Sequence, residues 1–565
     1  MGKIGKRIEK SGQWLFLLGV LGLLYAVAQA GAAWMLGQLS EKVVQLGWKQ
    51  LLRLGGLTVL VVAVQMALGY FYKFLEGKFG STGRRQLQEA CAGALAQAPT
   101  PWLHGRSSGD LLGRMQNELE VCVQCFCSAI PTIVSNIMGI AVCAAAMVAL
   151  SAKLALLYIV VTLLVVALQM ALSKPVQTSA QTMQRLRGQA NAMARDVLSQ
   201  RETVKAYNAR GFLLERYDGL LRPWQKAQVR AQAVASPIKG VGLLSGMLPT
   251  VFLCIMGSQM VRQDSLSIGA FMGIYFMANM LMNTTMHFVD QIVEYRQGAA
   301  AAQRLNEILE APREQALLAP PEKGGQITFE DVWFRYGETG DWVLKGVSFS
   351  IAQGEKVAFV GSSGCGKSTV LRLTEGFLQP QKGRILMDGQ PYEQLGAAVR
   401  QPIAFAPQQP FLFSGSLEEN IFFGRQASTQ EKEKIYADAG VQPFLTKLPE
   451  GAQTAVGEGG TGLSLGQSQR AAIARGLAKK ARLLALDEAT SALDAQSDAH
   501  IRQTIANLPQ ELTVAAVTHR LAGLDQYDRI YVMESGNIVE QGNHQELLAQ
   551  GGLYASLFNR GEDAE

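Results

Sequence analysis

Six long apolar runs in the first 300 residues constrain the fold of this chain more than any other feature. Each is close to the ~20 residues that an α-helix requires to cross the hydrocarbon core of a bilayer. Because lipid offers the backbone no hydrogen-bond partners, such runs fold as helices. The sequence therefore predicts a helical membrane domain of six spans over residues 1–300. The runs cover residues 14–36, 54–75, 130–150, 154–172, 241–261 and 268–289.

The composition of the chain agrees with a membrane domain joined to at least one further domain. Charged residues make up 17% of the 565 residues and hydrophobic ones 48%, whereas a soluble protein carries about 25% charged residues. A chain of this length exceeds one ordinary core, so several domains are expected. The net charge of +6 is modest for the length, and we expect no nucleic acid among the partners.

Basic residues predict how the membrane domain is oriented. Lys3, Lys6, Arg7 and Lys10 precede the first run, and many arginines lie between residues 174 and 239. Lysine and arginine gather on the cytoplasmic side of membrane proteins. Basic residues at positions 42, 49 and 53 run against this pattern. We expect a multi-pass protein of the cell membrane with both termini in the cytoplasm.

A glycine-rich loop in the second half of the chain predicts a phosphate-binding site. It follows an apolar run at residues 357–360 and precedes a helix-compatible segment at 370–373. Strand, glycine loop and helix form the context in which backbone N–H groups and a helix N-terminus surround phosphate oxygens. Its lysine can reach the terminal phosphates and its first hydroxyl can ligate Mg²⁺. The candidate residues are Gly361, Ser362, Ser363, Gly364, Cys365, Gly366, Lys367, Ser368 and Thr369.

The rest of the second half is predicted to be an α/β domain. Prolines and glycines in residues 301–325 indicate a linker. Short strands and helices then alternate over residues 326–565. An apolar strand at 482–486 ends in Asp487 and Glu488. Asp487 is placed to hold Mg²⁺, through water, and Glu488 to polarise the attacking water; a solvated acidic pair is the alternative.

The order of these motifs resembles the nucleotide-binding domain of ATP-binding cassette (ABC) transporters across residues 326–565. The resemblance implies ATP and Mg²⁺ as ligands and ATP hydrolysis as the activity. It implies that Tyr336 stacks on adenine, that Gln408 contacts Mg²⁺, and that His519 lies near the γ-phosphate. Residues 463–467 resemble the signature that contacts ATP held by the opposite subunit. The interface residues implied in this way are Ser464, Gly466, Gln467 and Asp494.

The first half resembles the exporter type of ABC membrane domain. Residues 108–112, with Arg114 and Asn117 beyond them, resemble the first coupling segment, and residues 202–207 resemble the start of the second. In the family, these segments press into grooves on the nucleotide-binding domains. The implied fold is an α-helical transmembrane domain of six spans followed by an α/β P-loop nucleotide-binding domain.

The signature departs from the family pattern at one position. Leu465 stands where the first glycine of Leu-Ser-Gly-Gly-Gln is usual, and a glycine permits backbone conformations and close approaches that leucine does not. One chain carries one nucleotide-binding domain and six spans, which is half of what the family requires. We therefore expect a dimer with a second half-transporter. A heterodimer is favoured over a homodimer, because a homodimer would place Leu465 in both ATP sites.

The predicted function is ATP-driven export of a hydrophobic or amphipathic substrate: a drug, a lipid or a peptide. The alternative is an importer built on the exporter fold, for example of siderophores. A non-transport ABC ATPase, acting in regulation or nucleic-acid repair, is disfavoured by the six spans. Cys122, Cys125 and Cys127 invite a metal site, but only the first two share a helix face, so we expect buried thiols.

Overall fold

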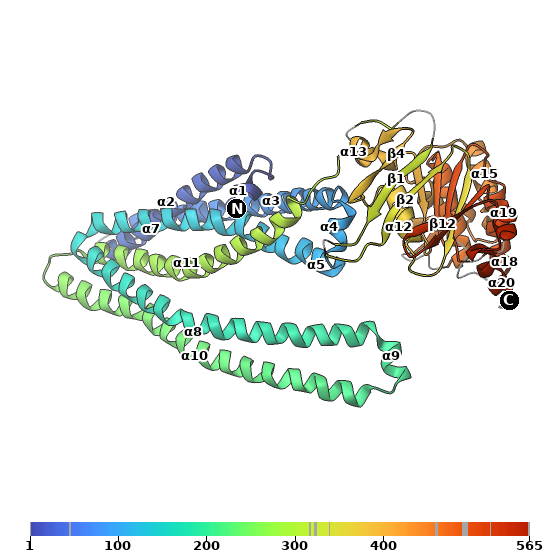
Figure 1. Cartoon of the computed structure of the whole chain (residues 1–565). Coiled ribbons are helices and arrows are strands. Elements are labelled where there is room, and N and C mark those ends of the chain that lie inside the picture. The colour runs from blue at the N-terminus through green and yellow to red at the C-terminus, as the bar shows by residue number, and fades with distance from the viewer. Residues whose placement is uncertain are drawn as a thin grey trace. The chain divides into compact units, whose positions relative to one another are not determined.

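The computed structural model separates the chain into two compact units, each considered by itself below (Figure 1). The first unit comprises residues 1–94 and 108–310, and the second comprises residues 95–107 and 311–565. The structure describes residues 2–43, 47–315, 318–320, 325–337, 339–457, 462–488, 495–519, 521 and 523–562.

The first unit is built from helices, and each predicted apolar run lies inside a long one. These are α2 (Ser11–Lys42), α3 (Trp48–Ala96), α7 (Ile130–Leu150), α8 (Ala152–Ser199), α10 (Arg210–Arg262) and α11 (Ile268–Leu309). Shorter pieces are α1 (Gly2–Gly5), α5 (Ser108–Gly113), α6 (Leu119–Gln124), α9 (Arg201–Ala206) and two π-helical turns, Arg114–Glu118 and Cys125–Ala129. Among the described residues, Ser11–Lys42, Trp48–Ala96 and Ser108–Leu150 are long and apolar enough to cross a membrane.

Small residues allow helix α2 to approach α11 closely. A Cβ atom on Gly37 would lie 2.5 Å from the carbonyl oxygen of Gly269 and 2.7 Å from the amide nitrogen of Gly273. Where lipid removes the hydrophobic drive between helices, such close backbone contact supplies the packing energy. A buried cluster continues beside it, where the Tyr158 hydroxyl donates to the Ala278 carbonyl over 2.8 Å.

Helices α8 and α10 run side by side as a hairpin, and the short helix α9 forms its turn (Figure 1). The second predicted coupling segment, residues 202–207, therefore falls on α9 and the residue after it. The cysteines singled out above are buried thiols, as expected. In the described part of the chain no three or more histidine, cysteine, aspartate or glutamate side chains cluster so that they could hold a metal ion.

The second unit contains two main sheets. A four-stranded antiparallel sheet has the order β2 (Leu344–Ile351), β1 (Ile327–Phe334), β4 (Lys382–Met387), β5 (Gln390–Pro391). A six-stranded sheet has the order β12 (Asn537–Gly542), β11 (Arg529–Glu534), β3 (Lys356–Gly361), β10 (Thr513–Val517), β9 (Leu483–Asp487), β6 (Ile403–Ala406). The strands β7 (Gly415–Ser416) and β8 (Ala455–Val456) pair separately.

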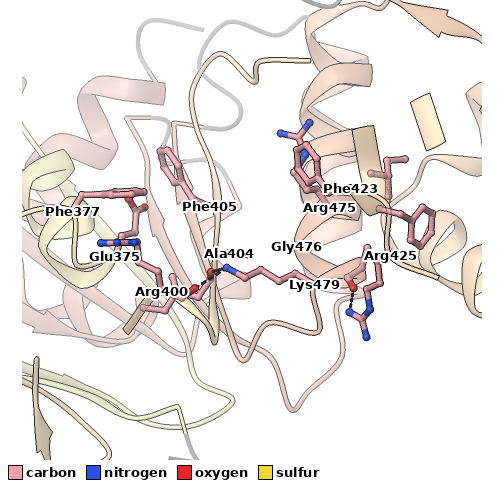
Figure 2. A pocket seen from close by; sticks show the side chains of 14 residues that line it. Glu375, Phe377, Arg400, Ala404, Phe405, Phe423, Arg425, Arg475, Gly476 and Lys479 are labelled. Atoms are coloured by element: carbon pink, nitrogen blue, oxygen red, sulfur yellow. Dashed lines mark hydrogen bonds between the residues drawn. The ribbon is translucent and has the colours of Figure 1, made fainter. Parts of the chain in front are cut away.

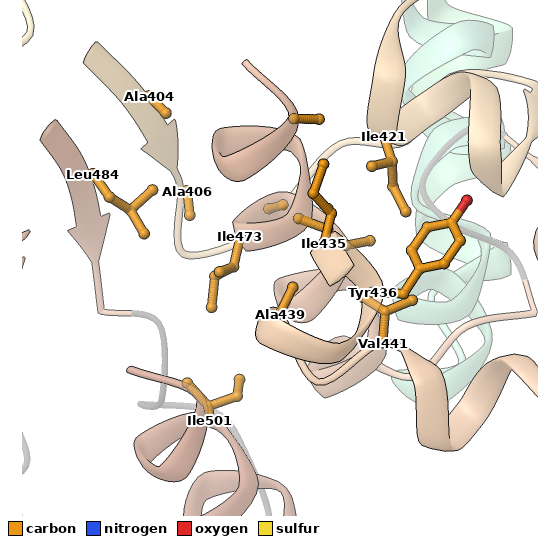
Figure 3. Close-up of a cluster of buried hydrophobic side chains, with 14 of the residues drawn as sticks. Ala404, Ala406, Ile421, Ile435, Tyr436, Ala439, Val441, Ile473, Leu484 and Ile501 are labelled. Atoms are coloured by element: carbon orange, nitrogen blue, oxygen red, sulfur yellow. The ribbon is translucent and has the colours of Figure 1, made fainter. Parts of the chain in front are cut away.

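Helices accompany both sheets. They are α4 (Thr100–His104), α12 (Lys367–Thr374), α13 (Tyr392–Leu395), α14 (Leu417–Phe422), α15 (Thr429–Asp438), α16 (Gln442–Leu445), α17 (Leu465–Ala478), α18 (Ala495–Ala506), α19 (His544–Gln550) and α20 (Leu553–Glu562). Short 3₁₀ turns occupy Ala397–Arg400, Gly451–Gln453 and Leu524–Gln526. A buried cluster that includes Ile435, Ile473 and Leu484 joins α15 and α17 to strand β9 (Figure 3).

The parallel register of the six-stranded sheet positions the candidate site. Strand β10 pairs with β3 on one side and β9 on the other, with Val517 opposite both Phe359 and Asp487. Strand β6 lies parallel beyond β9. The carboxyl ends of four strands thus meet at one edge, where open α/β sheets bind ligands. The residues that follow those ends are the ones that the motifs singled out.

Candidate active site

The glycine-rich loop runs from the end of β3 into helix α12. Gly366 is the residue before the helix and has φ 109°, a conformation that side chains rarely adopt. A Cβ there would also lie 2.8 Å from Leu344 Cδ2. The Lys367 ammonium donates to the carbonyls of Gly361 and Ser362 over 2.9 Å each. Burial disfavours the charged ammonium and lowers the pKa of Lys367. Negatively charged phosphate oxygens beside it would favour the charged form and oppose that shift.

The structure brings together Ser368 of the loop and Asp487 of strand β9, which are both expected to bind Mg²⁺. Ser368 Oγ donates to Asp487 Oδ1 over 3.2 Å. Burial raises the pKa of Asp487, and the bond from Ser368 opposes that shift. A hydroxyl and a carboxylate at this separation are the oxygen donors that Mg²⁺ uses beside nucleotide phosphates. The arrangement therefore fits a magnesium ion held by Ser368 and, directly or through water, by Asp487.

Glu488 is held between two side chains from neighbouring strand ends. Gln408, which follows β6, donates its amide to Glu488 Oε2 over 2.8 Å. His519, which follows β10, has its Nε2 2.7 Å from Glu488 Oε1. Glu488 itself has φ 48°, a strained conformation for a glutamate and one that clusters at functional sites. The carboxylate is 18% exposed, so it can still accept a hydrogen bond from water.

Tyr336 lies just beyond strand β1, on the antiparallel sheet. Its hydroxyl is 3.2 Å from Thr369 Oγ1, and its ring meets Phe334 edge-on at 5.0 Å. The ring is 49% exposed and can therefore stack on a planar ligand. Tyr336 borders a cavity of about 1290 Å³ that also reaches Gln408 and Asp487. One opening thus joins the expected base site at Tyr336 to two of the residues expected to bind Mg²⁺.

The signature residues stand at the start of helix α17. Ser464 caps the helix by accepting from the Gln467 amide over 3.3 Å, and Gln467 Oε1 accepts from the Ser464 amide over 2.8 Å. Leu465 is the first helical residue and packs partly against the buried cluster of Figure 3. None of residues 464–467 is among the described residues that line the 1290 Å³ cavity. Asp494 lies outside the described residues.

The first predicted coupling segment, residues 108–112, lies on helix α5 (Ser108–Gly113) of the first unit and stays a prediction. The residues just before it, 95–107, group with the second unit. Helix α3 ends at Ala96, and Pro99 is the N-cap residue of the short helix α4. The Glu314 amide donates to the Gln97 carbonyl over 2.8 Å.

Sequence reasoning missed Glu375, which directly follows helix α12. Its side chain borders the same cavity as Asp487 and is 1% exposed. Neither carboxylate oxygen has a hydrogen-bond partner in the described part of the chain. Burial raises the pKa of Glu375 to about 9, with the nearby Asp487 charge adding to the shift. The side chain is therefore neutral at pH 7.

Comparison with known proteins places this site in a family. Residues 15–285 match the ABC transporter transmembrane region, and residues 344–491 match the ABC transporter family. The ATP-dependent lipid A-core flippase of Alkalilimnicola ehrlichii is 31% identical, covering 84% of this chain and 82% of the flippase. The corresponding protein of Alcanivorax borkumensis is 29% identical, covering 96% and 94%.

A solved structure agrees over nearly the whole chain. A bacterial Atm1-family ABC exporter with ATP bound superposes with a TM-score of 0.78 and 26% identity, covering 98% of this chain and 99% of that one.

Together these matches cover the membrane domain and most of the nucleotide-binding domain, and they define an ATPase coupled to transport. The chain belongs to the ABC transporters, as an exporter-type half with membrane and nucleotide-binding domains fused. It is a multi-pass membrane protein that binds ATP with Mg²⁺ and hydrolyses ATP to drive export.

Proposed function

We propose that this chain is one half of a dimeric exporter that moves a lipid or similar amphipathic molecule out across the cytoplasmic membrane. One observation carries the proposal. Gln408, Glu488 and His519 are assembled at the sheet edge that carries the glycine-rich loop, whereas the signature stands at the start of helix α17. A site with every catalytic part except a signature requires a second subunit to bring one.

Within this proposal each site residue has a role. Lys367 and the amides of the loop hold the phosphates, and Tyr336 stacks on the adenine. Ser368, Gln408 and Asp487 serve Mg²⁺, which neutralises charge developing on the phosphates. Glu488, steadied by His519, orients and polarises the attacking water. The residues that contact the opposite subunit's ATP site are Ser464, Gly466, Gln467 and Asp494.

A lipid is the favoured substrate for two reasons. The relatives described above are named as lipid A-core flippases. In addition, large apolar side chains such as Leu163, Leu164 and Met66 lie exposed along α8 and α3 of this chain. Such surface suits lipid tails and the membrane itself. The basic N-terminus and the basic 174–239 segment favour a cytoplasmic location for both termini and the nucleotide-binding domain.

The partner is proposed to be a different half-transporter. Leu465 has ordinary helical backbone geometry, since it is absent from the positive-φ residues, and its side chain remains partly exposed beside Gly466. Our proposal is that a side chain at this position, where the family signature carries none, hinders a phosphate at the neighbouring Gly466. In a homodimer both ATP sites would carry this obstacle, whereas a heterodimer confines it to one.

ATPase assays of the purified chain test whether its partner is a different half-transporter. We expect a lone-chain dimer to show weak ATPase activity, and addition of a second half with a Leu-Ser-Gly-Gly-Gln signature to raise it. Size-exclusion chromatography with light scattering supplies the oligomeric state in each case. Robust turnover from the lone-chain dimer contradicts the heterodimer while leaving the export proposal intact.

Transport is tested in proteoliposomes that contain fluorescently labelled lipid A-core. ATP added outside reaches only transporters whose nucleotide-binding domains face outward. We expect such vesicles to move the lipid from the outer to the inner leaflet, and vesicles with Glu488→Gln protein to move none. ATP-dependent movement in the opposite direction would favour the import alternative, and an ATPase without lipid movement would exclude lipid as the cargo.

A further inference from the structure

Arg400 occupies a junction between three parts of the nucleotide-binding unit. It ends the 3₁₀ turn before strand β6, and its guanidinium forms an ion pair with Glu314 of the linker. Arg400 Nη1 also donates to the Gly376 carbonyl over 3.1 Å, and its guanidinium lies 5.7 Å from the centre of the Phe377 ring. The Arg400 and Glu314 side chains are 26% and 24% exposed. Charge-assisted bonds that are largely shielded from water are stronger than surface pairs.

The linker that carries Glu314 is itself tied on both sides by its backbone. The Glu314 amide donates to the Gln97 carbonyl of the 95–107 segment over 2.8 Å. The Gln315 carbonyl accepts from the Ala397 amide over 2.9 Å. A displacement of the 95–107 segment therefore pulls on Glu314 through a short, hydrogen-bonded connection.

On its other side, the Arg400 backbone is joined to the end of the signature helix. Lys479, the residue that caps α17, donates its ammonium to the Arg400 carbonyl over 2.7 Å and to the Ile403 carbonyl over 2.6 Å. Figure 2 shows the Lys479 side chain reaching from α17 to these oxygens. Ser464, a signature residue, is the N-cap at the opposite end of the same helix. A packed helix moves as one body, so holding one end constrains the other.

We propose that Glu314, Arg400 and Lys479 form a positioning relay that links the 95–107 segment to the signature helix. The relay sets the tilt of α17, and thereby the approach of Ser464 and Gly466 to the ATP of the opposite subunit. None of the three residues touches the reacting atoms. The relay rests on the two-subunit ATP site of the proposed function, and it adds the path by which movement of the segment reaches that site.

The test measures closure of the two-subunit site in the assembled transporter. In the Glu488→Gln background, closed sites retain radiolabelled ATP through gel filtration. Glu314→Gln and Lys479→Met, each added singly, are expected to lower the retained ATP about tenfold, as the loss of one charge-assisted bond implies. The double variant is expected to retain no less than the single ones, because one break already disconnects a relay.

Two controls separate positioning from general damage. Arg384→Gln breaks an exposed ion pair with Glu330 in the same unit and is expected to leave retention unchanged. Quenching of a fluorescent ATP analogue measures nucleotide binding by the loop and Tyr336, and is expected to be unchanged in every relay variant. Should Lys479→Met unfold, Lys479→Gln supplies the break on that side of Arg400, since its shorter, neutral side chain loses the ammonium donor to the Arg400 and Ile403 carbonyls.

Three other results would each contradict the relay or the two-subunit site on which it rests. Retention equal to the background in the single variants overturns the relay. Losses that multiply in the double variant show that Glu314 and Lys479 act independently, which also overturns it. If Glu488→Gln alone retains no ATP, the proposed two-subunit site fails, and the relay that rests on it fails too.

Discussion

Gln408 Nε2 donates to Glu488 Oε2 across 2.8 Å, although the two residues lie 80 positions apart in the chain. Gln408 follows strand β6 and Glu488 follows β9, and those strands are parallel neighbours in the sheet. The other carboxylate oxygen, Glu488 Oε1, lies 2.7 Å from His519 Nε2. Two partners thereby orient one carboxylate, which suits a residue that must hold water in a single attacking position.

Glu488→Gln is expected to trap ATP. The amide keeps the shape of the side chain but cannot accept a proton, so turnover should fall by about 10²–10⁴-fold, the usual contribution of a general base. Phosphate release by the assembled transporter measures the loss, and equilibrium nucleotide binding should be retained. Unchanged turnover would refute the role of Glu488. If the partner carries a normal signature, the same change should stop nearly all turnover by the complex.

Ser368→Ala is expected to raise the Mg²⁺ concentration that gives half-maximal ATPase activity. The substitution removes the hydroxyl 3.2 Å from Asp487, and with it one oxygen ligand of the ion. Activity is measured across a magnesium series at fixed ATP, after treatment with a chelator. Ser368→Thr keeps a hydroxyl and serves as the matched control. An identical magnesium dependence for alanine and serine would remove Ser368 from the metal site.

Tyr336→Ala is expected to weaken ATP binding by about 1–3 kcal/mol, the range measured for base–aromatic stacking by alanine substitution. Tyr336→Phe keeps the ring and loses only the hydroxyl near Thr369, so it should bind almost as the wild type does. Titration with a fluorescent ATP analogue distinguishes the two. Equal losses in both variants would assign the hydroxyl, and not the ring, as the binding element.

Glu375→Gln is expected to stabilise the folded protein at alkaline pH. Burial raises the folded-state pKa of Glu375 from its ordinary value of 4.5 to about 9, so the folded state holds a proton that the unfolded state releases. Its contribution is fully present below pH 4.5 and is lost as the pH rises towards 9, by about 1.4 kcal/mol per pH unit in that interval. Glutamine cannot ionise, so thermal unfolding at pH 6 and pH 8.5 should differ less in the variant. An unaltered difference would mean that Glu375 titrates normally.

Gly37→Leu is expected to separate helices α2 and α11. A side chain at this position would enter the backbone of Gly269 and Gly273, 2.5–2.7 Å from the new Cβ. Overpacking of this kind costs about 1–3 kcal/mol or more. Thermal unfolding in detergent measures the loss, and Gly31→Leu, on the same helix with open space around it, is the control. Equal effects at both positions would indicate a general cost of leucine in α2.

The membrane domain was predictable because a local property decides it. Twenty apolar residues in lipid have no alternative to a helix, and all six runs lie in the long helices of the first unit. The phosphate loop was predictable for a similar reason. Its glycines and lysine act within nine consecutive residues, and the strand before it and the helix after it are visible in the sequence.

The kind of protein can therefore be read from the chain alone: six helical spans, a phosphate loop, and an order of motifs that resembles one family. Tertiary structure decided which distant groups meet. The Gln408–Glu488–His519 set, the buried acid Glu375 and the Glu314–Arg400–Lys479 junction all depend on strand order and on loops that return to one another. A single sequence carries no local trace of such pairings, because each residue's environment is made by elements far from it in the chain.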